Sequence, residues 1–102
     1  MEEGNMPAAI RKGDICKGHG CFVPRPNDEG SPNVFINSIP AHRVGDHWMT
    51  HCCGPICHDS VAATGSPNVF VNGKPLCRED DKTHCGSSMG LTKSPNVYVN
   101  GR

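Results

Sequence analysis

The sequence contains few large apolar residues and no long apolar run. Its 102 residues include two leucines and three phenylalanines. No stretch approaches the roughly 20 apolar residues that span a bilayer, and the acidic, polar first five residues predict no Sec-type signal peptide. A chain of this size with so little Leu and Phe cannot depend on a large hydrophobic core. We therefore expect a covalent or metal staple, or a partner protein, to support the fold.

A basic excess and clustered aromatic residues are also missing. Lys plus Arg and Asp plus Glu both number 10, so the formal net charge is zero, and the five aromatic residues are scattered. Proteins that bind phosphate backbones carry a basic excess, and single-strand binders need stacking aromatics. The sequence also lacks a Gly-rich phosphate loop, a nucleophile elbow and a His-Glu-x-x-His motif. We predict neither nucleic-acid binding nor an enzymatic activity.

Cysteine and histidine, in contrast, are abundant. The chain has seven cysteines and six histidines, and the odd cysteine count leaves at least one sulfur outside any intramolecular disulfide scheme. Together these residues favour metal binding over disulfides as the staple. Cys16 and Cys21 could form a disulfide, make a second metal contact or pack in the interior. Cys77 is predicted to be buried.

One heptapeptide occurs three times, at residues 31–37, 66–72 and 94–100. Each copy begins Ser-Pro-Asn-Val and continues with an aromatic and a β-branched residue, a composition that suits a strand. The copies end in Asn-Ser or Asn-Gly, dipeptides that favour two-residue turns. Each heptapeptide therefore predicts the first strand and the turn of a β-hairpin.

Return strands are predicted at residues 40–46 and 75–81, and residues 7–14 have the same character. We expect residues 7–14 to pair with the third heptapeptide and close a ring of three hairpins, which would remove exposed sheet edges. The predicted fold is a small all-β domain over residues 6–102 with pseudo-threefold symmetry, preceded by an extension of residues 1–5. Three connecting segments, 15–30, 47–65 and 82–93, are expected to run together on one side of the hairpins.

A potential metal ligand lies near the start of each connecting segment, four or five residues after the Asp that closes the preceding strand. These residues are His19, His51 and Cys85. Equivalent positions of a threefold ring meet near its axis, so we expect the three side chains to converge. A set of imidazoles with one thiolate suits zinc best, with iron as the second choice.

A closed tetrahedral site needs a fourth ligand. We assign it to His58, and the alternatives left open are Cys52, Cys53, Cys57 and His84. His42 and His47 lie in or beside the strands and are predicted not to bind the metal. Arg11, Arg43 and Arg78 each precede an Asp by three residues, and we expect exposed ion pairs between strands, worth about 0–1 kcal/mol each.

The three repeats resemble those of PAAR-repeat proteins. The resemblance rests on Pro40-Ala41-His42-Arg43-Val44-Gly45-Asp46 and on the heptapeptides, and it covers Met6 to Gly101. Gly18-His19-Gly20-Cys21 and His51-Cys52-Cys53 are similar to a subfamily of contractile phage tails and bacterial secretion loci. The copy at 75–81 departs from the motif, because Asp80 stands where the other copies have Gly.

The resemblance implies a conical cap on the blunt end of a trimeric β-helical spike, in type VI secretion systems or contractile phage tails. It also implies one metal near the vertex, usually zinc held by three His and one Cys. By position these ligands are His19, His51, His58 and Cys85. One chain with three similar faces would meet three identical spike subunits, and the tip would contact the target membrane mechanically. We expect it in a virion tail tip or a secretion apparatus, assembled in the cytoplasm and delivered outside the cell.

The face that docks on such a spike is a further hypothesis. Alternation along the heptapeptides places aliphatic and aromatic side chains on opposite sides. We assign the aliphatic set to the spike interface, namely Val34, Ile36, Val69, Val71, Val97 and Val99. Phe35, Phe70 and Tyr98 are then expected to fill the cone, with Phe22 and Trp48 above the base. Alternative functions are an adaptor for separate effector proteins and, from Cys/His density alone, a zinc-binding nucleic-acid module.

Overall fold

The computed structural model describes residues 6–100, which form six short strands and no helix. Those strands are β1 (Phe35–Ile36), β2 (Ile39–Pro40), β3 (His47–Cys53), β4 (Ile56–Val61), β5 (Phe70–Val71) and β6 (Lys74–Pro75). Within the described part there is no helical segment with the length and apolar character needed to cross a membrane. The fold is all-β, as predicted, and the expected extension of residues 1–5 lies outside the described residues.

The first two heptapeptides form the predicted hairpins. β1 pairs antiparallel with β2, Phe35 opposite Pro40, and β5 pairs with β6 in the same register. The turns have the left-handed backbone that two-residue hairpins need, with φ of 55° at both Asn37 and Asn72. The strands are shorter than expected. Beyond Pro40 the Ala41 N–H still donates to the Val34 carbonyl at 3.0 Å, but the Val34 N–H donates to Ser31 Oγ at 2.9 Å rather than to the return strand.

The third heptapeptide pairs with the N-terminal segment. Ala8 bridges Tyr98 in antiparallel fashion. The backbone N–H of Ala9 donates to the Val97 carbonyl at 3.0 Å, and the N–H of Val99 donates to the Pro7 carbonyl at 2.8 Å. Segments from the two ends of the chain therefore complete a third strand pair.

The three repeat units contact one another through equivalent residues. Backbone bridges join Ala9 to Arg78, Ala41 to Arg11 and Leu76 to Arg43. The heptapeptide serines also donate to asparagines of other copies: Ser31 to Asn72, Ser66 to Asn100 and Ser94 to Asn37, at 2.6–2.7 Å. Each unit therefore makes the same two kinds of contact with its neighbours, in cyclic order.

Two small clusters form the core. The first contains Ala9, Ile36, Ala41, Val71, Leu76 and Val99, with Val69 and Val97 packed against it. The second contains Ile10, Cys16, Trp48, Ala62, Cys77 and Met89. Trp48 and Cys77 are buried, as predicted. The core is thin, as expected from the scarcity of Leu and Phe.

The expected packing of the heptapeptide side chains is reversed for the aromatic residues. Phe35, Phe70 and Tyr98 are 55%, 55% and 52% exposed, so they do not fill the interior. Their aliphatic neighbours Ile36, Val71 and Val99 are buried instead. The first cluster also contains Ala9 and Ala41. Because these side chains are small, the backbones lie close together, and the space between them suits aliphatic side chains. The alternation of a strand then directs each aromatic ring outward.

The Arg–Asp pairs are buried within single turns, which corrects the expectation of exposed pairs between strands. Arg43 donates through Nε to Oδ2 of Asp46 at 2.8 Å and through Nη2 to Oδ1 at 2.9 Å. The backbone N–H of Arg43 donates to the same carboxylate at 2.9 Å. The same arrangement recurs in Arg11–Asp14 and Arg78–Asp81. Each carboxylate thus fixes both the side chain and the backbone of its turn.

The departure from the motif at Asp80 does not change this turn. Asp80 has a φ of +70°, close to the +87° and +91° of Gly13 and Gly45 in the other copies. Asp is one of the few non-glycine residues that tolerates this conformation. Asp80 also forms an exposed ion pair with Lys17 at 2.9 Å.

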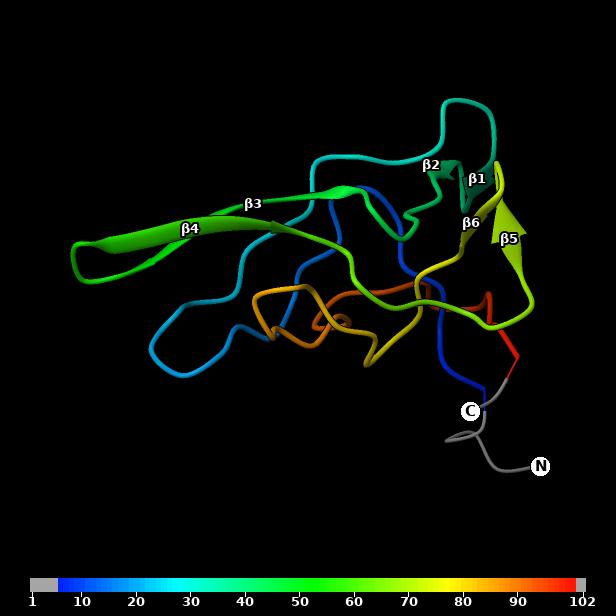
Figure 1. The fold of residues 1–102 in the computed structure, drawn as a ribbon. Coiled ribbons are helices and arrows are strands. Elements are labelled where there is room, and N and C mark those ends of the chain that lie inside the picture. Colours follow the sequence, from blue (N-terminus) through cyan, green and yellow to red (C-terminus); the bar gives the residue numbers. More distant parts are fainter. Residues whose placement is uncertain (1–5, 101–102) are drawn as a thin grey trace.

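Connecting segment 47–65, to which the sequence pattern assigned no strand, contains two. Residues 47–61 form the longest hairpin of the described residues, in which β3 pairs antiparallel with β4 around Gly54 and Pro55. Figure 1 shows this hairpin extending away from the short hairpins β1–β2 and β5–β6. The Cys52–Cys57 disulfide joins β3 and β4.

Replacing Asp46 with Ala is expected to lower the free energy of unfolding by about 3–5 kcal/mol, because it leaves the buried Arg43 guanidinium without its anion. Chemical denaturation of both proteins measures the difference. Lys17→Met breaks an exposed pair and serves as the control, with an expected loss of about 0–1 kcal/mol. Equal losses in the two variants would contradict the structural role of the buried turn.

Candidate metal centre

Hairpin β3–β4 presents two histidines on one face. His51 of β3 lies directly opposite His58 of β4, and cross-strand partners have neighbouring side chains on the same side of a sheet. The adjacent cross-strand pair, Cys52 and Cys57, faces the other side by strand alternation and forms a disulfide. This disulfide joins the two strands where they approach the turn.

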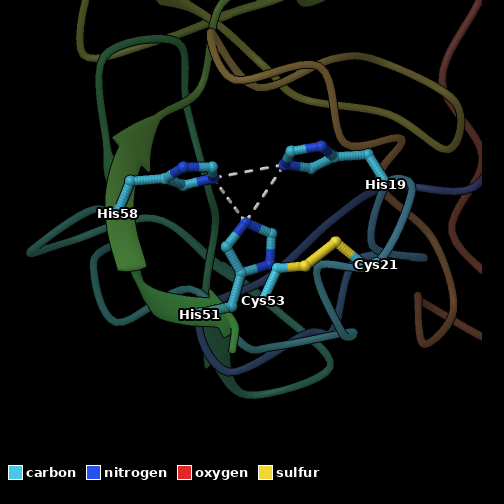
Figure 2. Close-up of a disulfide and its surroundings, with 5 residues drawn as sticks. All are labelled: His19, Cys21, His51, Cys53 and His58. Carbon is cyan, nitrogen blue, oxygen red and sulfur yellow. Dashed lines mark hydrogen bonds between the residues drawn. A yellow bond between two sulfur atoms is a disulfide. The ribbon is translucent and has the colours of Figure 1, made fainter. Parts of the chain in front are cut away.

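A tight turn in segment 15–30 brings His19 to the same place. The His19 and Phe22 backbones exchange two hydrogen bonds, of 3.0 and 2.8 Å. Gly18 permits this turn, because its φ is +76° and a Cβ there would lie 2.5 Å from the Phe22 carbonyl oxygen. A second disulfide, Cys21–Cys53, ties the turn to β3. Figure 2 shows this bridge beside the three imidazoles.

Cys85 comes from the third connecting segment. A compact turn from Thr83 to Ser87 supports it, with the Ser87 N–H donating to Thr83 Oγ1 at 3.0 Å and the Thr83 N–H to the Ser87 carbonyl at 3.0 Å. The Cys85 N–H donates to Ser60 Oγ of β4 at 3.1 Å. Segment 82–93 is therefore attached to the hairpin that carries His51 and His58.

The four side chains predicted from repeat register and resemblance converge. One ligand atom from each of His19, His51, His58 and Cys85 lies within 4.8 Å of the other three. The Nε2 atoms of the histidines are 2.8–3.2 Å apart, and Cys85 Sγ is 3.9 Å from His51 Nε2. Ligand atoms around a tetrahedral Zn²⁺ are roughly 3.3–3.6 Å apart, given bonds of about 2.0–2.3 Å. The observed separations lie on both sides of these values, and the three imidazoles and one thiol are donor types that suit one tetrahedral ion.

The imidazoles are oriented for this role. His51 Nδ1 lies 2.7 Å from the Val23 carbonyl, which can only accept, so Nδ1 carries the proton and Nε2 offers its lone pair to the group. Phe22 stacks on His19 and His58, with ring centroids 4.8 and 4.2 Å away. Figure 2 shows the three Nε2 atoms directed toward one another. Such second contacts fix ring orientation before any ion binds.

The surroundings of Cys85 favour its thiolate form. Burial alone would raise the pKa of the Cys85 thiol, but hydrogen bonds from Thr83, Arg25 and Ser60 outweigh it and lower the pKa to about 4. Thr83 Oγ1 lies 3.1 Å from the sulfur and Arg25 Nη2 lies 3.4 Å from it. Since metal binding requires the thiolate, this environment favours a soft divalent ion at neutral pH.

The other candidate ligands do not join the group. Cys52, Cys53 and Cys57 are consumed by disulfides, and His84 is exposed and outside the cluster. His42 and His47, predicted not to bind metal, are also outside it. Burial lowers the pKa of His42, whose Nδ1 is 2.7 Å from the Glu29 carbonyl oxygen.

His47 lies outside the cluster and forms hydrogen bonds with two carboxylates. Its ring lies between Asp59 and Asp28, at 2.8 and 2.7 Å, and hydrogen bonds to these carboxylates raise its pKa. It thus links segment 15–30 to the β3–β4 hairpin.

Disulfides contribute more than the cysteine pattern predicted. Four of the seven cysteines are paired, Cys21 with Cys53 and Cys52 with Cys57, while Cys16, Cys77 and Cys85 are free. Of the possibilities left open for Cys21, a disulfide is the one observed, but its partner is not Cys16. The staple therefore consists of the His3Cys cluster and two disulfides together, and all of them involve the connecting segments.

Sequence reasoning also missed Arg25, which lies in a connecting segment without a recognisable motif. Its side chain is 4% exposed and touches Cys85, a member of the cluster. The only sequence signal was a lone arginine between two prolines, Pro24 and Pro26, which by itself indicates nothing specific.

The family model for the PAAR motif matches residues 19–90, which include all four members of the cluster. The chain belongs to the PAAR-motif family. No curated protein matches the chain. The family assignment agrees with the resemblance seen in the repeats, and the PAAR motif is a structural motif of spike-tip proteins rather than an enzyme motif. In this chain the matched region contains a His3Cys group suited to a metal ion.

The two disulfides should differ in their effect on metal binding. A variant with both Cys21→Ser and Cys53→Ser is expected to bind Zn²⁺ roughly tenfold more weakly, because the bridge restrains the His19 turn against β3 and its loss adds chain entropy to the free site. Chelator competition measures the affinity. The matched control, Cys52→Ser with Cys57→Ser, removes a bridge on the opposite face and should change affinity less than about threefold. Similar affinities in both double variants would refute this difference.

Proposed function

We propose that the chain is a metal-stabilised tip that caps a trimeric β-helical spike and sharpens it for puncturing a target envelope. The observation that carries the proposal is the convergence of His19, His51, His58 and Cys85 from three separate connecting segments in a PAAR-motif protein. A tip must resist compression, yet these segments share only the small second core cluster. One ion bound by all three would add a rigid cross-link to that core.

The proposed ion is zinc. Three neutral imidazoles and one thiolate form a closed tetrahedral set, which is typical of structural zinc, and no ligand position is left for a substrate. Structural zinc contributes roughly 10–16 kcal/mol of apparent binding free energy in small peptides. That amount is comparable with the whole stability of a small domain, about 5–15 kcal/mol, so loss of the metal would endanger the fold. Iron remains the second choice for this site.

The proposed pseudo-threefold ring is supported by the cyclic contacts between repeat units. Three equivalent bridges and three equivalent Ser–Asn hydrogen bonds link each unit to the next. A partner with three identical subunits can present the same surface to each unit, which is the symmetry match that one chain needs to cap a trimer. The setting would be a phage tail tip or a bacterial secretion apparatus.

The proposed docking face is the aliphatic side of the heptapeptides. Val34 is 37% exposed, and Val69 and Val97 are partly buried against the first core cluster. Ile36, Val71 and Val99, assigned to the same face, are largely covered by the chain itself, so Val34, Val69 and Val97 would supply most of the contact area. The outward aromatic set is the competing face.

Metal content tests the proposed centre. Purified protein should contain one zinc per chain by elemental analysis, because the four ligands form a single tetrahedral group. Cys85→Ala or His51→Ala should lose most of that metal and unfold at a lower temperature. His84→Ala, which changes the exposed neighbour of Cys85, is the control and should retain a full equivalent. Full metal in the Cys85→Ala protein would show that the assignment is wrong.

Docking is tested with a purified trimeric β-helical spike protein. Val34→Lys is expected to weaken binding by about tenfold or more, because it places a charge in an apolar interface. Phe35→Lys alters the adjacent residue on the opposite face and should leave affinity within about twofold, as a change outside the interface does. The reverse result would assign docking to the aromatic face, and no binding by the unaltered chain would refute the cap function. Thermal unfolding of each variant confirms that the fold is retained.

A further inference from the structure

Arg25 is a buried cation without a carboxylate partner. Among residues 6–100, Arg11, Arg43 and Arg78 each donate to an Asp, whereas no carboxylate of that part of the chain lies within ion-pair distance of Arg25. Its side chain is nevertheless 4% exposed. Burying a guanidinium without a compensating anion costs several kcal/mol. Other groups near Arg25 must therefore offset the cost of its burial.

Sulfur atoms occupy the positions where carboxylates are found in the other pairs. Arg25 Nη2 donates to Cys85 Sγ at 3.4 Å, and Nη1 donates to Cys16 Sγ at 3.1 Å. Nη1 also donates to Ser87 Oγ at 3.3 Å. A guanidinium presents its donors in a fixed planar fork, so it can hold two acceptors at once in a defined geometry. Cys85 is the sulfur that belongs to the His3Cys group.

The guanidinium is itself held rigidly. Its Nε donates to the Met49 carbonyl of β3 at 2.7 Å, and its plane lies over the Trp48 ring, 5.4 Å from the ring centroid. Trp48 and Cys16 belong to the second core cluster. Arg25 therefore connects that cluster, β3 and the Cys85 turn through one side chain, and the position of the Cys85 sulfur depends on all three.

We propose that Arg25 is the positioning residue of the metal centre, which holds the Cys85 sulfur in the ligand position and supplies the positive charge beside it. This role rests on the proposed metal centre. It differs from that of the four ligands, because Arg25 has no lone pair to offer and acts through the sulfur. Partners of this kind determine ligand orientation and tune the metal–sulfur bond.

Co²⁺ substitution provides the test, because the thiolate-to-cobalt charge-transfer band reports directly on the sulfur. A hydrogen bond to a thiolate stabilises its lone pairs and raises the energy of this band. Arg25→Met, which keeps apolar bulk but donates no hydrogen bond, should shift the band to longer wavelength and weaken Zn²⁺ binding about 10- to 100-fold. Arg25→Lys retains the charge without the fork and should restore part of both properties.

The matched control is Cys16→Ala. It removes the other sulfur on the same guanidinium and so changes core packing near Arg25, but it leaves the Nη2 contact with Cys85 in place. Its charge-transfer band should match that of the wild type even if its unfolding temperature falls. A band shift in Arg25→Met without one in Cys16→Ala separates positioning of the ligand from a merely structural role.

The failures are distinguishable. An Arg25→Met protein with wild-type band position and Zn²⁺ affinity overturns the role of Arg25 while leaving the metal centre intact. If that variant does not fold, Arg25→Lys decides, and wild-type values in both measurements again overturn the proposal. A wild-type chain that takes up no Co²⁺, or takes it up without a thiolate band, refutes the proposed metal centre itself, and this role with it.

Discussion

The structure depends on one convergence: three connecting segments, which share only the small second core cluster, bring His19, His51, His58 and Cys85 within 4.8 Å of one another. Three imidazoles and a sulfur at this distance have little reason to associate by themselves, since they bring polar groups together without forming a hydrophobic cluster. A shared cation would change this balance. Three features direct the nitrogen and sulfur lone pairs toward one point. They are the His19 turn, the cross-strand pair on β3–β4, and the Thr83–Ser87 turn.

Different interactions stabilise the repeated strand pairs. There the repeated Ser-Pro-Asn-Val segments form short strand pairs, and equivalent bridges and Ser–Asn hydrogen bonds link each unit to the next. Strands of two residues would be unstable alone. Their stability comes from the first core cluster, which contains Ile36, Val71 and Val99, and from the Arg–Asp turns, in which one carboxylate satisfies a guanidinium and a backbone N–H together. Polar contacts thus do much of the work that apolar burial performs in larger domains.

Disulfides and the metal-type cluster act on the same region. Cys21–Cys53 connects the segments that carry His19 and His51, each two residues from its histidine. The bridge limits the conformations of the free site, so the entropy that a bound ion must overcome is smaller. Arg25 adds a third kind of support, because it fixes the sulfur ligand from the core side. The disulfide, the His3Cys cluster and the Arg25 contact therefore all support the connecting segments.

The sequence by itself determined the repeated strand pairs and three of the four clustered side chains. Three near-identical heptapeptides predicted hairpins, and the spacing from Asp14, Asp46 and Asp81 predicted three of the four clustered side chains, because a repeated unit places equivalent residues at equivalent points. Only the tertiary structure decided the remainder. The β3–β4 hairpin, the Cys21–Cys53 pairing, the outward aromatics and the contact of Arg25 with Cys85 each depend on groups far apart in the chain, whose approach no local pattern encodes.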